Sequence, residues 1–227
     1  MLEPYIRRAA LKVLECFIAL LDPLLRRANA DRVRKNVERN REFVEQLEAL
    51  GYYLYADASE LTGLKVEAME SDCPFIFQNN GRFYHADGED LAENGVVGFL
   101  KSLSFFLEHQ KVVIRSLQGE DVPDEYCVRV NDAVHVIYTR AEDEEAESKK
   151  LGLIWGLTTA RTFAIVNKLL AGANSSERLY AIYGGNDLAG VFLTQHLFDF
   201  ISTHPSVPDS EKPYLPTEDY PWHGQPH

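Results

Sequence analysis

The apolar positions of the first fifty residues recur at steps of three and four, which is the spacing of an amphipathic helix. Asp22-Pro23 interrupts this pattern, and so does the stretch Asn29–Asp31, where the aspartate can cap a new helix. Gly51 ends the periodic stretch. The pattern predicts a helical hairpin over residues 1–50.

Strand signals follow, with aromatic and β-branched residues between turn residues. The aromatic run Tyr52–Ala56 predicts a strand, and Asp57 with Glu60 three residues later predicts a helix start. The strongest local signal is Asn80-Gly81 between two aromatic runs. It predicts a hairpin over Phe75–His85 that lies inside the sheet, because both of its faces are partly apolar.

One helix and two more strand regions are predicted in the middle of the chain. Asp87 can cap a helix whose apolar positions continue to His109. Val112–Leu117 predicts a strand and Gly119–Glu125 an acidic loop. A second hairpin is predicted from Tyr126–Val130 and Val134–Thr139.

The longest predicted helix begins in the acidic run Glu142–Glu147 and continues to Leu170. Its part over Leu151–Leu170 is apolar on more than one face, which is typical of a buried central helix. Gly152 and Gly156 lower helix propensity, which the helix tolerates if another segment packs closely there. A third hairpin joins Leu179–Tyr183 to Leu188–Thr194 through residues 184–187, and a short helix follows over Gln195–Ser202.

Six of the ten prolines fall between Pro205 and Pro226, so residues 205–227 are predicted to form an extended tail. Residues 1–204 are predicted to form a single domain, with sheet and helices over 51–204. The predicted fold class is α+β: an antiparallel sheet built from hairpins and packed against long helices, an N-terminal helical pair and a proline-rich C-terminal tail.

The distribution of charge along the chain favours one kind of binding partner, a cationic one. The first fifty residues hold ten Lys or Arg and eight Asp or Glu, a net charge of +2. The remaining residues hold thirteen Lys or Arg and twenty-seven Asp or Glu, a net charge of −14, so the whole chain carries −12. An acidic body repels nucleic acid and anionic lipid and attracts cationic partners. The basic stretch Arg26–Arg41 has no aromatic interleaving, so it is interpreted as a solvated helix face and not as a nucleic-acid site.

The chain is expected to be cytoplasmic. The apolar stretch from Ala9 to Leu25 is interrupted by charges and a proline before it reaches the roughly 20 residues of a membrane span. It also lacks the pattern of a secretory signal. Cys16, Cys73 and Cys127 lie more than fifty residues apart, which predicts neither a disulfide framework nor a zinc site.

The chain contains residue types that catalytic sites use, but their spacing does not predict such a site. Cys73, His85 and Asp87 offer the residue types of an activated thiolate, but in the predicted hairpin Cys73 lies opposite Gly88, away from the histidine. Arg161, on a mostly apolar helix, needs a carboxylate partner or a bound anion, and a structural ion pair is the favoured interpretation. No catalytic residue, metal site or cofactor is predicted, and no family can be matched motif by motif.

Two functions remain as hypotheses, and the oligomeric state stays open. The first is a non-catalytic binding protein that inhibits a basic protein partner, as immunity proteins and antitoxins do, through the acidic residues Asp121, Asp124, Glu125, Glu142, Asp143, Glu144 and Glu145. The alternative is a small-molecule enzyme or ligand-binding domain whose pocket lies between the sheet and the 151–170 helix, with Arg161, His85 and Cys73 as its polar groups.

Overall fold

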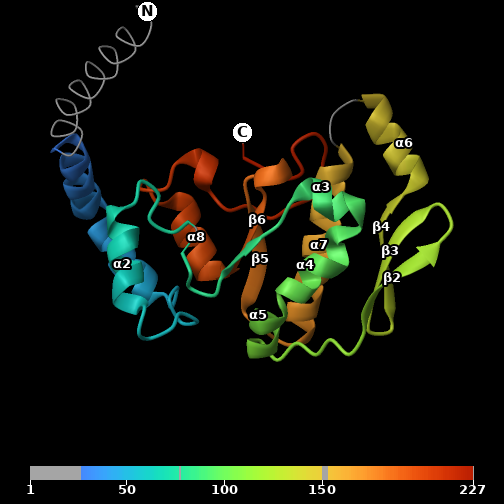
Figure 1. Ribbon diagram of the computed structural model, residues 1–227, viewed down its shortest axis with the longest axis horizontal. Helices are drawn as coiled ribbons and strands as arrows, with labels where there is room; N and C mark the ends of the chain where they lie inside the picture. Colours follow the sequence, from blue (N-terminus) through green and yellow to red (C-terminus); the bar gives the residue numbers. More distant parts are fainter. Residues whose placement is uncertain (1–26, 77, 150–152, 227) are drawn as a thin grey trace, which may run out of the picture.

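The computed structural model describes residues 27–76, 78–149 and 153–226, which form alternating layers of helices and antiparallel sheets (Figure 1). The helices are a helix over 27–49, α2 (Leu61–Glu70), α3 (Gly88–Asp90), α4 (Val96–Ser102), α5 (Ser104–His109), α6 (Arg140–Lys149), α7 (Leu153–Gly172) and α8 (Gln195–Thr203). The strands are β1 (Phe83–His85), β2 (Leu117–Val122), β3 (Glu125–Val130), β4 (Ala133–Thr139), β5 (Glu177–Ile182) and β6 (Ala189–Thr194). The α+β class is therefore confirmed.

The first sheet has the strand order β1-β6-β5 and is buried on both faces. Successive side chains of a strand point to opposite faces, so Tyr180 and Ile182 belong to one core while Leu179 and Ala181 belong to the other. The helix over 27–49, α2 and α8 cover the first face, and α7 covers the second (Figure 1). The third predicted hairpin is confirmed as the β5–β6 pair.

The second sheet has the strand order β2-β3-β4, and α7 lies between it and the first sheet (Figure 1). One sheet was predicted from the hairpins, and this part of the prediction was wrong. The β3–β4 hairpin was correctly predicted and turns at Asn131 and Asp132, since Val130 pairs with Ala133. β2 covers Leu117–Val122, so the strand predicted over 112–117 begins and ends too early in the chain. Most of the acidic loop predicted over 119–125 belongs to β2 and to the start of β3.

The buried central helix is confirmed as α7, in which Phe163, Val166 and Leu170 are at most 1% exposed. The acidic run before it forms a separate helix, α6, which has its own direction (Figure 1). The prediction of one helix from 142 to 170 was therefore wrong. Asp87 caps α3 as predicted, with its carboxylate accepting the backbone N–H groups of Glu89 and Asp90. The helical path to His109 is divided by a kink at η1 (Leu91–Gly95).

The hairpin predicted over Phe75–His85 was wrong. β1 pairs with β6, and Phe83 faces Val191. Asn80-Gly81 still turns the chain, because Gly81 has a φ of +76° that favours glycine. Of the residues before this turn, the described ones, 75, 76, 78 and 79, are not in a strand; instead the ring of Phe75 joins the core under the N-terminal helices.

Two further predictions in the N-terminal part need correction. Residues 52–56 form turns, not a strand, although Tyr52 and Tyr53 are buried. The helix over 27–49 runs without a break at Asn29–Asp31, and the first half of the predicted helical hairpin lies outside the described residues. This helix pairs with the loop after α2, where Arg32 lies 2.6 Å from the carboxylate of Asp72.

The C-terminal segment after α8 packs onto the first sheet. Tyr214 forms a bridge with Ala181 on the free edge of β5, so the backbone of this strand is paired on both sides. A short turn, η3 (Asp209–Glu211), precedes the bridge. Within the described residues Cys73 and Cys127 are free thiols, and no helix has the length and apolarity that crossing a membrane requires.

Candidate functional site

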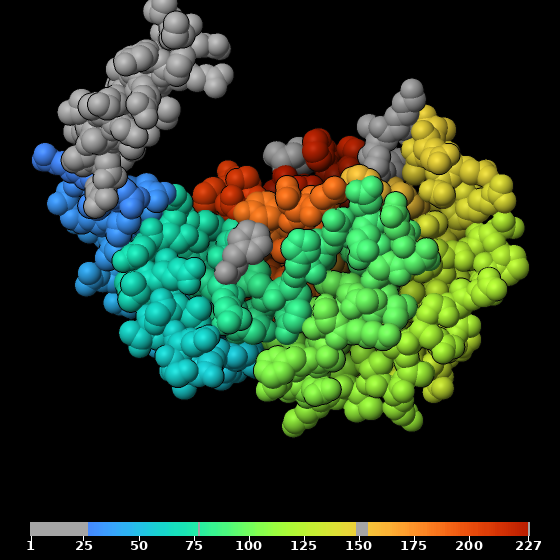
Figure 2. Space-filling view, in the orientation of Figure 1, coloured from blue at the N-terminus to red at the C-terminus, as the bar shows by residue number. Residues whose placement is uncertain are grey.

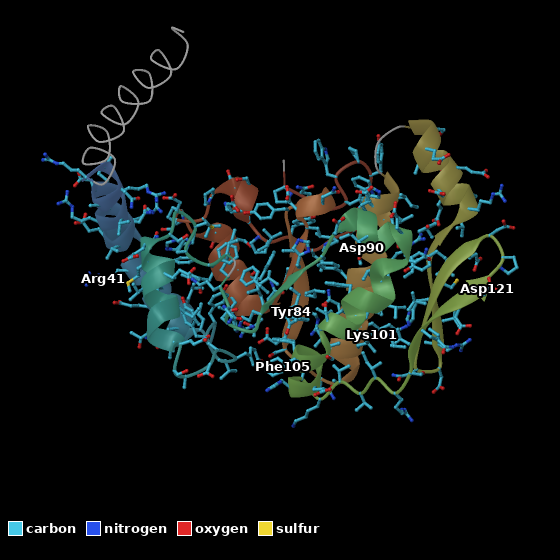
Figure 3. The ribbon with its side chains drawn as sticks, viewed as in Figure 1. Arg41, Tyr84, Asp90, Lys101, Phe105 and Asp121 are labelled. Atoms are coloured by element: carbon cyan, nitrogen blue, oxygen red, sulfur yellow. The ribbon has the colours of Figure 1, made fainter. Side chains whose placement is uncertain are left out.

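Most of the acidic residues predicted to bind a partner meet at one cavity of about 350 Å³. It lies beside the β2–β3 hairpin, which is at the right of Figure 2, and Asp121 of this hairpin is labelled in Figure 3. We call it the acidic cavity. Its lining includes Glu120, Asp121, Asp124, Glu125 and Asp143 together with Asn94, Tyr126, Tyr138 and Arg140.

The acids of the hairpin converge because the chain reverses within two residues. Val122 pairs with Glu125, so Pro123 and Asp124 form the turn, and Asp124 adopts a φ of +62° that aspartate tolerates better than most residues. Asp121 and Glu125 therefore stand on adjacent strands, close to the turn. All three carboxylates are on exposed residues at the cavity rim.

Two tyrosines form the aromatic part of the cavity. The rings of Tyr126 and Tyr138 lie edge to face with centroids 5.4 Å apart. The Tyr138 hydroxyl donates to the carbonyl of Ala92 at 2.9 Å, and the Tyr126 hydroxyl accepts the N–H of Val96 at 3.2 Å. The two bonds attach the second sheet to the kinked segment η1 and to the start of α4, and they fix the two rings in place.

The electrostatics around these rings add two acids that the sequence analysis did not include. Burial raises the pKa of Tyr126 to about 12; the hydrogen bond with Val96 is the next-largest effect and lowers it, and the neighbouring Tyr138 and Asp90 add smaller increases. Burial, followed by Asp143 and Glu93, raises the pKa of Tyr138. Two further carboxylates therefore act on these tyrosines through their charge: Asp90, which is labelled in Figure 3, acts on Tyr126, and Glu93 acts on Tyr138. Nothing in the spacing or composition of the chain predicts this, because Asp90 and Glu93 lie about thirty residues or more before the hairpin in the sequence.

Arginines neutralise this charge only in part. Arg140 lies 3.3 Å from Asp124 and 2.9 Å from Glu144, but its side chain is 68% exposed, so both pairs are weak. Arg129 pairs with Glu120 at 2.5 Å, and this hydrogen bond, with one from Gln118, lowers the pKa of Glu120 to about 2. The cavity lining still carries five carboxylates against the one guanidinium of Arg140.

The remaining predicted acids are placed differently. Glu142 forms a capping box with Thr139 at the start of α6 and binds Arg161 through both carboxylate oxygens, at 2.8 and 3.0 Å. The hydrogen bond from Arg161 is the main cause that lowers the pKa of Glu142. Glu142 therefore supports the fold and is not among the residues that line the acidic cavity. Glu144 and Glu145 lie on exposed positions of α6.

The three polar residues of the alternative pocket are not brought together at the cavity that Arg161 lines. Arg161 lines this cavity with His135 and Lys168, and neither His85 nor Cys73 contributes to it. His85 is exposed at the end of β1, opposite Ala189. Burial raises the pKa of Cys73 to about 12, so its thiol stays protonated at neutral pH. The structural ion pair predicted for Arg161 is present, with Glu142 and Glu218 as partners.

No group of three or more His, Cys, Asp or Glu side chains is arranged to hold a metal ion in the part of the chain that the structure describes. Comparison of the chain with protein-family models, with curated proteins and with solved structures found no match.

Proposed function

We propose that this protein is a non-catalytic binding protein of the cytoplasm that inhibits or escorts a basic protein, in the manner of an immunity protein or antitoxin. The observation that carries the proposal is the acidic cavity, where carboxylates from the β2–β3 hairpin and α6 surround two fixed tyrosine rings. A basic side chain of the partner, inserted between these groups, would meet both negative charge and aromatic surface.

Arginine is the side chain that this combination suits best. Its planar guanidinium forms paired hydrogen bonds with carboxylates and stacks on aromatic rings, whereas a lysine ammonium is a strongly hydrated point charge. Asp121 and Glu125 supply carboxylates on adjacent strands, and Tyr126 and Tyr138 supply the rings. Cation–π contact with a tyrosine adds about 0.5–1 kcal/mol at an exposed site.

The net charge supports the same function through the rate of association. A chain with a charge of −12 attracts cationic proteins over distances limited by the Debye length, about 8 Å at physiological ionic strength. Rim charges mainly raise the association rate and its dependence on salt. An inhibitor that must capture a harmful basic protein quickly gains from such a field.

The test is binding of a short peptide of alternating arginine and glycine, followed by fluorescence anisotropy at several salt concentrations. A peptide with citrulline in place of every arginine is the control, because citrulline keeps the shape and removes the charge. The proposal expects binding of the arginine peptide that weakens as salt rises, and little binding of the citrulline peptide. Equal binding of both peptides would contradict it.

A pair of matched variants separates the cavity from overall charge. Asp121→Asn with Glu125→Gln removes two cavity carboxylates, while Glu60→Gln with Glu67→Gln removes two exposed ones next to or on α2. Both variants reach the same net charge. The proposal expects the first to weaken binding several-fold and the second to leave it nearly unchanged, and equal losses would show that the cavity has no special part.

A further inference from the structure

Strand β4 is an edge strand of the second sheet, on the side nearer to α7 (Figure 1). An edge strand offers unpaired N–H and C=O groups to any other chain, and proteins usually protect such edges. The other edges in the described part of the chain are protected: β5 pairs with Tyr214, β1 has only three residues, and β2 carries Glu120 and Asp121. β4 has seven residues, and none of them is Pro, Lys, Asp or Glu.

The open part of this edge lies at Val134 and Val136. The β3–β4 turn has two residues, so His135 exchanges backbone hydrogen bonds with β3, and the N–H and C=O groups of the two valines point the other way. Within the described residues, no group outside the sheet is hydrogen-bonded to the backbone of either valine. Further along the strand, Arg161 donates to the carbonyl of Ile137 at 3.1 Å and closes the edge there.

A groove runs along this edge. The cavity that Arg161 lines, of about 350 Å³, has residues 134–136 of β4 on one side and Ile165 and Lys168 of α7 on the other. A neighbouring cavity of about 620 Å³ shares His135, Ile165 and Lys168 with it. The valines at positions 134 and 136 are 44% and 41% exposed, so solvent reaches this side of the strand. We call the two cavities together the β4 groove.

The β4 groove carries positive charge, although the chain as a whole is acidic. Lys168 is exposed and forms no ion pair with any residue that the structure describes, whereas Arg161 is already paired with two carboxylates. In the wider cavity Lys111 and Lys168 stand against one acid, Asp132. A ligand of the groove therefore gains most if it brings a carboxylate to Lys168.

The two faces of β4 differ in what they offer to an added strand. His135 pairs with Val128, which is fully buried in the core beside α7, so its imidazole is on the α7 face. Burial, followed by the charge of Lys168, lowers the pKa of His135, which agrees with an ammonium close to the ring. Val134 pairs with Arg129 on the opposite, exposed face. An added strand would thus meet polar groups on one face and valines on the other.

We propose that the free edge of β4 receives an extended segment of a partner protein as an additional antiparallel strand, with carboxylate side chains beside His135 and Lys168. In such strand addition, backbone hydrogen bonds supply affinity and alternate side chains supply specificity. The residues that exchange bonds with Val134 and Val136 have their side chains on the exposed face, and the residue between them faces α7. A segment that alternates valine and glutamate fits both faces.

A second copy of this chain fits the edge less well. Pairing of two β4 strands would bring two basic grooves together, and like charges opposed across an interface disfavour association. The proposed site is separate from the acidic cavity and does not depend on the function proposed for it.

The test uses the capped peptide Glu-Val-Glu-Val-Glu and the neutral control Gln-Val-Gln-Val-Gln, with amide hydrogen exchange followed by NMR. The amides of Val134 and Val136 face outward and should exchange quickly in the protein alone. A saturating amount of the glutamate peptide should slow them at least about tenfold, while His135, already bonded to β3, changes little. The glutamine peptide should bind several-fold more weakly. Slow exchange of both valine amides in the protein alone, or unchanged exchange with the glutamate peptide, would overturn the proposal.

Two methylated isomers of the glutamate peptide test how its backbone is used. N-methylation of both valine amides removes the donors that face β4, whereas N-methylation of two glutamate amides alters only the far edge of the added strand. The first isomer is expected to bind at least about tenfold more weakly, and the second to stay within about threefold of the parent. Equal losses, or losses in the reverse order, would contradict antiparallel addition.

Variants of the protein locate the site. Val134→Pro removes one outward N–H, which an edge position tolerates, and should weaken binding at least about tenfold, while Val134→Thr keeps this group and should bind normally. Lys168→Gln should weaken binding of the glutamate peptide several-fold, and Lys101→Gln, which removes an equally exposed cation from α4, should not. Circular dichroism shows whether each variant is folded. Unchanged binding to folded Val134→Pro, or equal effects of the two lysine variants, would overturn the proposal.

Discussion

The guanidinium of Arg82 and the carboxylate of Glu177 form an ion pair at 2.8 Å inside the protein, with side chains only 1% and 4% exposed. Arg82 also donates to the carbonyls of Gly51, Tyr52 and Phe192, at 2.7 to 3.0 Å. The pair thus joins the turn after the N-terminal helix to β1, β5 and β6. It holds the helical layer against the first sheet.

Breaking this pair should destabilise the protein strongly. Arg82→Met leaves the Glu177 carboxylate buried without its cation, and Glu177→Leu leaves the guanidinium without its anion, so each should cost about 3–5 kcal/mol in free energy of unfolding. Urea denaturation measures this. Arg32→Met is the control, because the Arg32–Asp72 pair is 58% and 66% exposed and is worth at most about 1 kcal/mol. Similar costs for the buried and exposed pairs would contradict the assignment.

The contacts of Arg82 also explain why Asn80-Gly81, a strong hairpin signal, led to a wrong prediction. Asn80-Gly81 does form a turn, but the next residue enters the interior, and the carbonyls that receive its guanidinium belong to residues 51, 52 and 192. The strand that follows pairs with β6, more than a hundred residues away in the chain. Hairpins whose strands are neighbours in sequence, such as β5–β6, were predictable because the turn and both strands are local.

Only the part of the acidic cavity that is built from residues close in sequence was predictable. Asp121, Asp124 and Glu125 are close in sequence, so their grouping follows from any turn in that region. Asp90 and Glu93 come near the two tyrosines only because Tyr138 contacts η1 and Tyr126 contacts the first residue of α4. Such a tertiary contact has no signature in spacing or composition. Similarly, the aromatic run at Tyr52 predicted a strand because aromatics favour strands, whereas these rings are buried from turns.

The helix cap at Asp87 gives a second prediction. Its carboxylate accepts the N–H groups of Glu89 at 2.8 Å and Asp90 at 3.2 Å. Asp87→Ala should lower the free energy of unfolding by about 1 kcal/mol, whereas Asp87→Asn, which keeps an acceptor, should cost less. Urea titrations of the three proteins check this order. An alanine variant as stable as the original protein would show that the cap contributes nothing.

The Glu142–Arg161 pair makes stability depend on pH. The fold lowers the pKa of Glu142 below its ordinary value of 4.5, chiefly through the hydrogen bond from Arg161. The folded state therefore favours the carboxylate, and this stabilisation is complete above pH 4.5 and is lost as the pH falls through the folded-state pKa. Glu142→Gln should cost about 1–2 kcal/mol at neutral pH.

The difference between the two proteins should then shrink as the solution is acidified below pH 4.5. Urea denaturation at a series of pH values measures this difference. Glu218→Gln removes the more exposed partner of Arg161, 58% accessible, and should have a smaller effect. A constant difference between Glu142→Gln and the original protein across this range would refute the electrostatic origin.

Asn131 holds the segment before β2 against the β3–β4 turn. Its side-chain oxygen accepts the N–H of Arg115 at 2.6 Å, its amide nitrogen donates to the carbonyl of Val113 at 3.0 Å, and its φ is +55°. Asn131→Gly keeps the backbone relaxed and loses both bonds, which should cost about 1–2 kcal/mol. Asn131→Ala should cost about 1 kcal/mol more, because alanine is strained at this φ.

Amide hydrogen exchange locates this effect. The Arg115 amide should lose its protection in both variants, and Asn131→Asp, which keeps the acceptor, should retain most of it. Amides inside the β5–β6 hairpin, which Asn131 does not touch, serve as the internal control for global unfolding. Protection of Arg115 that is unchanged in Asn131→Gly would mean that the segment is held by its packing alone.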